Sequence, residues 1–193
     1  SDMAKLASKV YGDALFQLAV EENRVDEIME EILAVDTALK ENPELTRLME
    51  HPDIVKEEKE KLIENCFKGR VSDDVTGFLV VVVRKGRYQE LPAIFTYLIS
   101  QMKEYKKIGI AQVDSAMELS PQWKKKIEER LLATTRYETM EITYRVDKSL
   151  LGGMVIRLGD RVVDSSLKHK LETLKGQLLK ITLEEQKEGG QAL

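Results

Sequence analysis

The sequence predicts a mostly α-helical protein, with a six-helix bundle over residues 1–105 followed by a small α+β domain over residues 106–193. Three observations support this. Apolar residues recur at the spacing of amphipathic helices through the first part. After Lys107 the pattern changes to the alternation of half-buried strands. Charge also divides there, with 14 basic and 21 acidic residues before 106 against 16 basic and 13 acidic residues from 106 on.

Four helices are predicted in the first 70 residues. The second covers residues 25–39 and stops before Pro43, because proline disfavours helical backbone at the residue before it. A short helix over 44–49 and a longer one over 55–67 follow, the latter ending at a glycine cap. The first helix carries a stripe at four-residue spacing: Leu6, Val10, Ala14 and Leu18.

Residues 72–87 combine two conflicting signals. Six consecutive apolar residues, four of them valine, occupy 78–83, and this composition favours a buried strand. The ends indicate a helix, because Ser72 suits an N-cap, acidic residues follow it, and basic residues precede Gly86. We therefore expect a buried helix, with a sixth helix over 91–102.

The second domain mixes strands with helices. A helix begins at Ser120, with proline at its first position, and runs to residue 131. A last helix follows Asp164 or Ser165, and residues from about 184 are expected to be frayed. The strands, the last two joined by a hairpin turn at Gly159-Asp160, are predicted at residues 108–113, 140–146, 154–158 and 162–163.

Composition excludes several kinds of site. The single cysteine, Cys66, allows no internal disulfide and no cysteine cage for a metal, and it fits a reducing compartment. Two histidines, His51 and His169, are too few for a multi-histidine metal site. No apolar run is long enough for a membrane span, and no secretory signal is visible. We expect neither a metal nor a cofactor.

No motif for catalysis emerges. The glycines near Gly153 match neither a phosphate loop nor a dinucleotide loop, since a strand follows them. Asp160 and Asp164 occupy an ordinary turn and an ordinary cap rather than a shielded carboxylate pair. The three lysines at 124–126 are followed by two glutamates, which is typical of a solvated helix face.

An interaction surface remains as the candidate. The first helix has small residues at Ser8, Gly12 and Ala14, and the fifth has Gly77. Glycine within a helix often marks a close approach. Around the aromatic residues Tyr11 and Phe78, such positions suit a shallow groove for a partner helix. Packing within the bundle explains the same pattern, and the pattern alone leaves both explanations open.

Several short segments occur along the chain in a characteristic order: 7–19, Gly86-Arg87 with 91–94, Ser115-Ala116 with Leu119-Ser120, 146–153, 156–160 and 163–166. No single segment is decisive, but together they span about residues 4–180. In sequence and spacing they resemble the delta subunit family of F-type ATP synthase, which includes the oligomycin sensitivity-conferring protein.

The resemblance implies a non-catalytic subunit of the peripheral stalk. In this family the helical domain grips the N-terminal helix of an alpha subunit, and the second domain meets the C-terminal ends of the b subunits. The stalk holds the catalytic head still while the rotor turns, on the cytoplasmic face of the bacterial membrane. The family's alpha-binding surface lies on the first and fifth helices, at positions that match Tyr11, Ala14, Gly77, Phe78 and Val81.

The resemblance further implies contact with the membrane only through the complex, no nucleic acid, and a monomer in isolation. Three alternatives stay open at this point. A helical RNA-binding module of the antitermination kind requires a basic bundle, whereas residues 1–105 carry a net charge of −7. The others are a small enzyme that uses Asp160 and Asp164, and an unrelated scaffold.

Overall fold

The computed structural model describes residues 2–150, 154–159 and 161–162. Its helices and strands divide into two units, Ser1–Tyr105 and Lys106–Leu193, and each unit is described by itself. The described part is mostly helical with a small sheet, as the sequence predicts. The predicted hairpin residue Asp160, the end of the last strand, the last helix and the tail from about 184 lie outside the described residues.

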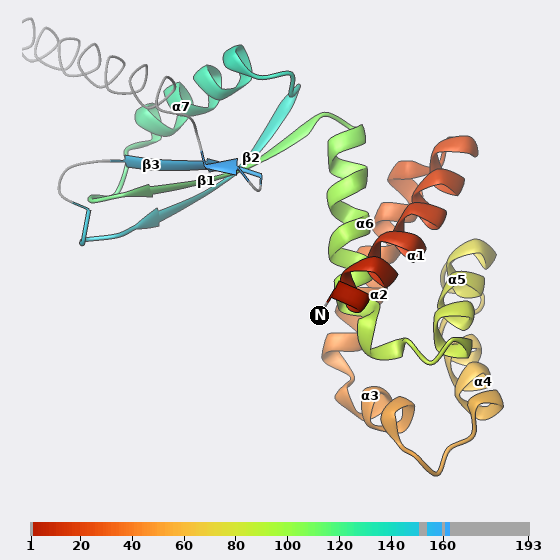
Figure 1. The fold of residues 1–193 in the computed structure, drawn as a ribbon. Helices are drawn as coiled ribbons and strands as arrows, with labels where there is room; N and C mark the ends of the chain where they lie inside the picture. Colours follow the sequence, from red (N-terminus) through yellow and green to blue (C-terminus); the bar gives the residue numbers. More distant parts are fainter. Residues whose placement is uncertain (1, 151–153, 160, 163–193) are drawn as a thin grey trace, which may run out of the picture. The chain divides into compact units, whose positions relative to one another are not determined.

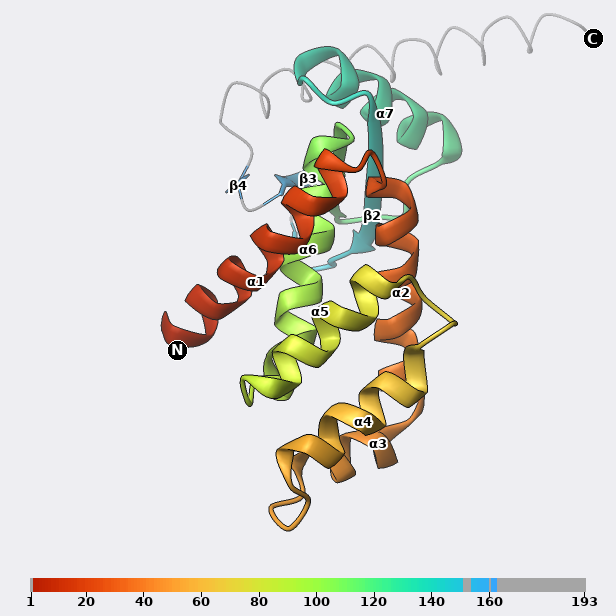
Figure 2. The same cartoon turned by 90° about the vertical axis from the view of Figure 1, so that its right-hand side faces the viewer.

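The first unit consists of helices in its described residues (Figure 1). Helix α6 is the main neighbour of α1, and α5 packs chiefly against α4. Figure 2 shows α5 in front of α6, seen from the right-hand side of Figure 1. The elements are α1 (Asp2–Glu21), α2 (Val25–Glu41), α3 (Pro43–Glu50), α4 (Lys56–Phe67), α5 (Asp73–Arg84), the 3-10 helix η1 (Tyr88–Glu90) and α6 (Leu91–Tyr105).

One cluster of buried apolar side chains takes members from every helix of this unit. Burial of each large aliphatic or aromatic side chain contributes about 1.5–3 kcal/mol, so this cluster is the main source of the unit's stability. Its largest fully buried members include Phe95, Ile28, Ile32, Ile63, Leu79, Leu91, Ile94, Leu98 and Met102.

The valine-rich segment is helical, which confirms the prediction from its ends. The side-chain oxygen of Ser72 accepts a hydrogen bond from the backbone N–H of Val75 at 3.4 Å, as an N-cap does. Val82 and Val83 are buried in the common cluster. Burial of this apolar face outweighs the strand preference of β-branched residues, because that preference is less than about 1 kcal/mol per residue. Gly86 follows with a positive φ of 70°, as predicted for a helix end.

The second unit is a small sheet with one described helix. Strand β1 (Ile108–Ser115) pairs in parallel with β2 (Thr139–Val146), and α7 (Pro121–Thr134) connects them. On its other side β1 pairs antiparallel with β3 (Met154–Leu158), and β3 pairs with β4 (Arg161–Val162). The strand order is therefore β2-β1-β3-β4. Its own core consists of Ala111, Val113, Ile127, Leu131 and Ile156.

Candidate functional site

Helix α1 has apolar residues on two faces. One face is buried and includes Leu15 and Ala19, which belong to the common core. The other carries Met3, Leu6 and Val10, whose side chains are 75%, 63% and 56% exposed. We name these three residues the α1 apolar row. Leu6 and Val10 are therefore not part of a core-facing stripe with Leu18, as the four-residue spacing suggested.

The two helical glycines have different surroundings. Gly12 is buried, and a Cβ atom placed on it would lie 2.5 Å from Cδ1 of Tyr97 on α6. Ser8 is also buried, and its hydroxyl donates to the Ala4 carbonyl at 2.9 Å. Gly77 is exposed, with no atom within 4 Å of such a Cβ. Ser8 and Gly12 therefore pack within the unit and do not line an outer groove, whereas Gly77 faces open space on the surface of α5.

The five predicted partner-binding residues occupy outward or half-buried positions. On α1, Ala14 is exposed and Tyr11 is half-buried against the core. On α5, Val81 is 39% exposed, one helical turn beyond Gly77. Phe78 is half-buried against the same core as Tyr11. The aromatic residues therefore anchor the two helices in the core, and Ala14, Gly77 and Val81 form the accessible part of the set.

The sequence analysis did not assign the α1 apolar row to this surface. A signal was present, because the apolar residues of α1 cover more of the helix than a single core-facing stripe of about 100° requires. Leu6 and Val10 lie on one side, and Leu15 and Ala19 on another. The core covers the face with Leu15 and Ala19 and leaves the α1 apolar row accessible.

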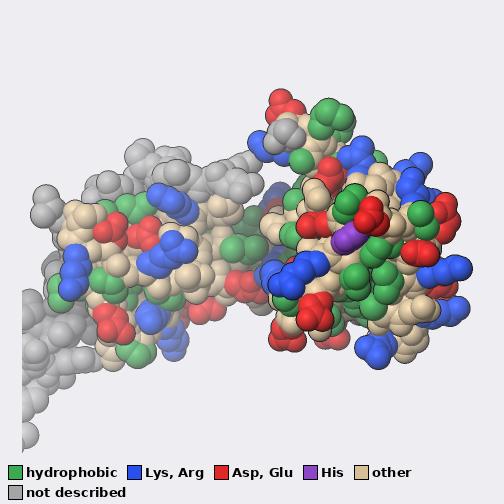
Figure 3. Space-filling model, turned by 90° about the horizontal axis from the view of Figure 1, so that it is seen from below, with side chains coloured by type: hydrophobic (Ala, Val, Ile, Leu, Met, Phe, Trp, Pro, Cys, Tyr) green, Lys and Arg blue, Asp and Glu red, His purple; other side chains and the backbone are tan. Residues whose placement is uncertain are grey.

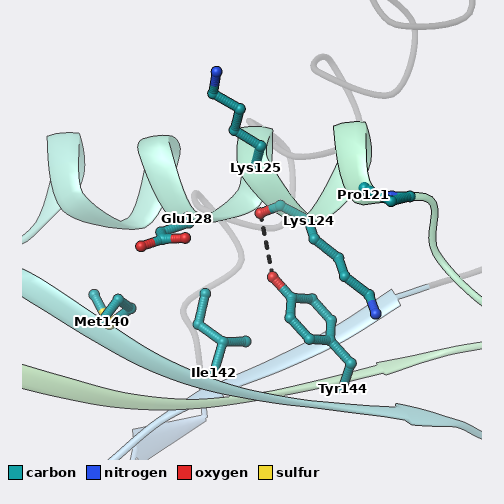
Figure 4. A pocket seen from close by; sticks show the side chains of 7 residues that line it. All are labelled: Pro121, Lys124, Lys125, Glu128, Met140, Ile142 and Tyr144. Carbon is teal, nitrogen blue, oxygen red and sulfur yellow. Dashed lines mark hydrogen bonds between the residues drawn. The ribbon is translucent and has the colours of Figure 1, made fainter.

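The second unit has a shallow hollow between α7 and β2, with a volume of about 420 Å³ (Figure 4). The hydroxyl of Tyr144 donates to the backbone carbonyl of Lys124 at 3.2 Å, and the Lys124 ammonium lies 4.9 Å from the ring centre. Burial, and then the charge of Glu128, raises the pKa of Tyr144. These contacts attach α7 to the sheet. The side chains that line this hollow do not place a nucleophile beside a general base. The hollow is lined by Pro121, Lys124, Lys125, Glu128, Met140, Ile142 and Tyr144.

The remaining reactive residues do not form a chemical site in the part of the chain that the structure describes. His51 is exposed, and its Nδ1 accepts from the backbone N–H of Asp53 at 3.1 Å. Cys66 is a free thiol, partly buried against the common core. Within the described ranges no three His, Cys, Asp or Glu residues gather as metal ligands. Asp160, Asp164 and His169 lie outside them.

The charged side chains of the first unit are mixed in sign. Figure 3 views the molecule from below, where acidic and basic side chains alternate around apolar ones. Nucleic-acid sites instead require a continuous basic face. Among the described residues, no helix is long and apolar enough to cross a membrane.

Comparison with known proteins identifies the family. The family model for the ATP synthase delta (OSCP) subunit matches residues 7–178. The chain belongs to this family. The ATP synthase subunit delta of Lachnoclostridium phytofermentans is 57% identical over 181 residues, which cover 94% of this chain and all of that protein. The subunit of the same name from Brevibacillus brevis is 33% identical over 89% of this chain and 97% of its own length.

The solved structures agree with this assignment at the level of the fold. A chain in the cryo-EM structure of the Toxoplasma gondii mitochondrial ATP synthase hexamer matches with a TM-score of 0.64 at 18% identity. The match covers 89% of this chain and 97% of that one. Membership of the ATP synthase delta (OSCP) family decides among the alternatives, in favour of an ATP synthase subunit over an RNA-binding module, a small enzyme or an unrelated scaffold.

Proposed function

We propose that this chain is the non-catalytic stator subunit of an F-type ATP synthase, which links the catalytic head to the b subunits. The family match supports the parent complex. The observation that carries the role of the first unit is the α1 apolar row, three large side chains that are each more than half exposed. Exposed apolar side chains on one face of a helix support a binding site for a protein partner there.

The occupant we propose is the N-terminal helix of an alpha subunit. An amphipathic helix presents apolar residues at three- and four-residue spacing, and such a stripe fits a groove between two helices. The α1 apolar row would form one wall, with Ala14 beside it. Gly77 and Val81 on α5 would form the other, because Gly77 leaves space for a close approach. Tyr11 and Phe78 support the two walls from the core side.

A static contact of this type suits a stator. Torque from the rotor must be resisted without any chemical step, so the subunit needs tight, shape-matched surfaces and no active site of its own. We propose that the helices of the first unit act as one six-helix bundle, since their buried residues form one cluster. The second unit is proposed to meet the b subunits. The membrane contact is then indirect, through the complex at the cytoplasmic face of the bacterial membrane.

A pair of matched substitutions tests the alpha-binding surface. Val10 and Val55 are both 56% exposed, and only Val10 lies on the proposed surface. A peptide of the alpha-subunit N-terminal helix is titrated by calorimetry against the full parent chain and against its Val10→Asp and Val55→Asp variants. We expect Val10→Asp to weaken binding by roughly a hundredfold, because a desolvated carboxylate then faces an apolar partner.

The control Val55→Asp is expected to bind like the parent, since Asp is well suited to its N-cap position before α4. Equal affinity for the parent and for Val10→Asp would contradict this assignment of the surface. Tyr11→Asp is the less decisive variant, because Tyr11 also packs on the core and its replacement alters folding as well as binding.

A further inference from the structure

The close contact between α1 and α6 centres on a residue without a side chain. Gly12 is buried, and a Cβ on it would lie 2.5 Å from Cδ1 and 3.0 Å from Cε1 of Tyr97. Real Cβ atoms do not approach a neighbouring ring atom that closely, so any larger residue must displace either the ring or the helix. Gly12 therefore fixes how near α1 lies to α6.

The ring of Tyr97 cannot move aside easily. Its hydroxyl donates to Oδ1 of Asp13 at 2.6 Å, a short bond to a carboxylate on α1 itself. The same tyrosine thus contacts two consecutive residues of α1, Gly12 with its ring carbons and Asp13 with its hydroxyl. Two contacts at different angles around a helix fix its rotation as well as its distance.

The rotation fixed in this way determines where the α1 apolar row points. Successive residues of an α-helix are about 100° apart around the axis. Met3, Leu6 and Val10 therefore lie about 120–180° around the helix from Gly12. Seating Gly12 against α6 turns the opposite face, with these three side chains, outward, in agreement with their exposure.

We propose that Gly12, Asp13 and Tyr97 are positioning residues that set the rotation and depth of α1 and so present the α1 apolar row to a partner helix. None of the three lies in the α1 apolar row. This inference rests on the proposed function, because it assigns these residues a role in binding through the placement of α1. It predicts that affinity for the partner depends on them beyond their share in stability.

Two tyrosines of the same unit provide a matched comparison. Tyr88 donates or accepts a hydrogen bond with the Thr46 hydroxyl on α3 at 2.9 Å, and Tyr97 bonds to α1. In the full chain, Tyr97→Phe and Tyr88→Phe each remove one hydroxyl contact. The alpha-subunit peptide is titrated against both, with thermal unfolding recorded in parallel. We expect Tyr97→Phe alone to weaken binding, by about fivefold, and Gly12→Ala by about tenfold.

A rescue experiment separates the contact at Gly12 from a general loss of stability. Gly12→Ala is introduced into the parent and into Tyr97→Ala, where the ring is absent. In the parent, we expect Gly12→Ala to lower both the thermal midpoint and the affinity for the peptide. In the Tyr97→Ala background, we expect Gly12→Ala to change neither quantity. Equal losses in both backgrounds would overturn the inference, because the ring would then not be what Gly12 accommodates.

The outcomes also distinguish this inference from the proposed function. If the parent binds the peptide and both Gly12→Ala and Tyr97→Phe bind it equally well, the positioning role is wrong while the proposed function stands. If the parent binds no peptide, the proposed function is wrong, and so is the positioning role of Gly12, Asp13 and Tyr97 in binding. Val10→Asp, measured alongside, loses affinity in the first case.

Discussion

Tyr97 illustrates how single side chains hold the first unit together. Burial, the hydrogen bond to Asp13 and the charge of that carboxylate together raise the pKa of Tyr97 from 10.0 to about 12. All three favour the neutral phenol, because a phenolate would lose its donor proton and face a negative charge. The contact between α6 and α1 therefore depends on a proton that stays bound to well above neutral pH.

The pH dependence of stability follows from this raised pKa. Below pH 10, Tyr97 is protonated in both the folded and the unfolded chain, so its contribution to stability is complete. Between pH 10 and about 12 the unfolded chain releases the proton first, and this contribution is lost as the pH rises. Urea unfolding at several alkaline pH values measures the effect.

Tyr97→Phe is the control for this prediction, and we expect a smaller loss of stability over the same pH range for that variant. Asp13→Asn removes the negative charge and is expected to lower the pKa of Tyr97, which phenolate absorbance in the folded state reports. An alkaline loss of stability that is identical in the parent and in Tyr97→Phe would contradict the assignment.

At the scale of elements, polar contacts at helix ends orient α5 against α2. Both the backbone N–H and the hydroxyl of Ser72 donate to the Glu31 carboxylate on α2, at 3.1 Å and 2.7 Å. Near the start of α2, Arg24 donates to Asp74 in the first turn of α5 at 2.7 Å. These directional hydrogen bonds add to the apolar packing of α5 in fixing its rotation against α2.

Replacement of this cap tests its contribution. We expect Ser72→Ala to lower the free energy of unfolding by about 1–2 kcal/mol, because the N-cap bond and the bond to Glu31 are both lost. Ser72→Thr retains the hydroxyl and is expected to lose only about a few tenths of a kcal/mol. Urea unfolding followed by helical circular dichroism compares the two. Equal losses of unfolding free energy in Ser72→Ala and Ser72→Thr would contradict the stabilising role of the Ser72 hydroxyl.

At the scale of the whole molecule, the buried apolar side chains of the described residues form two hydrophobic cores, one in each unit. The first draws on residues of all six helices and η1, and the second on β1, α7 and β3. The division falls at residue 105, between α6 and β1. Each unit therefore contains the apolar contacts that stabilise it, which suits a subunit proposed to bind two different partners.

A fragment of residues 1–105 is expected to fold by itself. It contains every member of its core, so it should unfold cooperatively with the helical circular dichroism of α1 to α6. Within it, Ile28→Ala should cost about 2–5 kcal/mol, because Ile28 is fully buried. Leu33→Ala, on the same helix but 45% exposed, is the control with a small effect. A fragment that shows no cooperative transition would contradict this prediction.

Local sequence determined much of this protein. Helix and strand types follow from periodicity, and the ends follow from residues such as Ser72, Pro43 and Gly86, whose backbone preferences act within a few residues. The helical state of the valine run was decided in this way. The family resemblance was also present in short segments, and the family match over residues 7–178 agrees with it.

Tertiary structure alone decided which faces are buried. Leu6 and Leu15 are both leucines of one helix, yet one is 63% exposed and the other 4%. Gly12 and Gly77 are both glycines within helices, yet only Gly12 meets a neighbouring ring. The alternation of apolar and polar residues predicts strands, but it does not give their order in the sheet, which is β2-β1-β3-β4. The physical reason is common to all three, because burial and pairing depend on neighbours distant in the sequence, such as Tyr97 for Gly12.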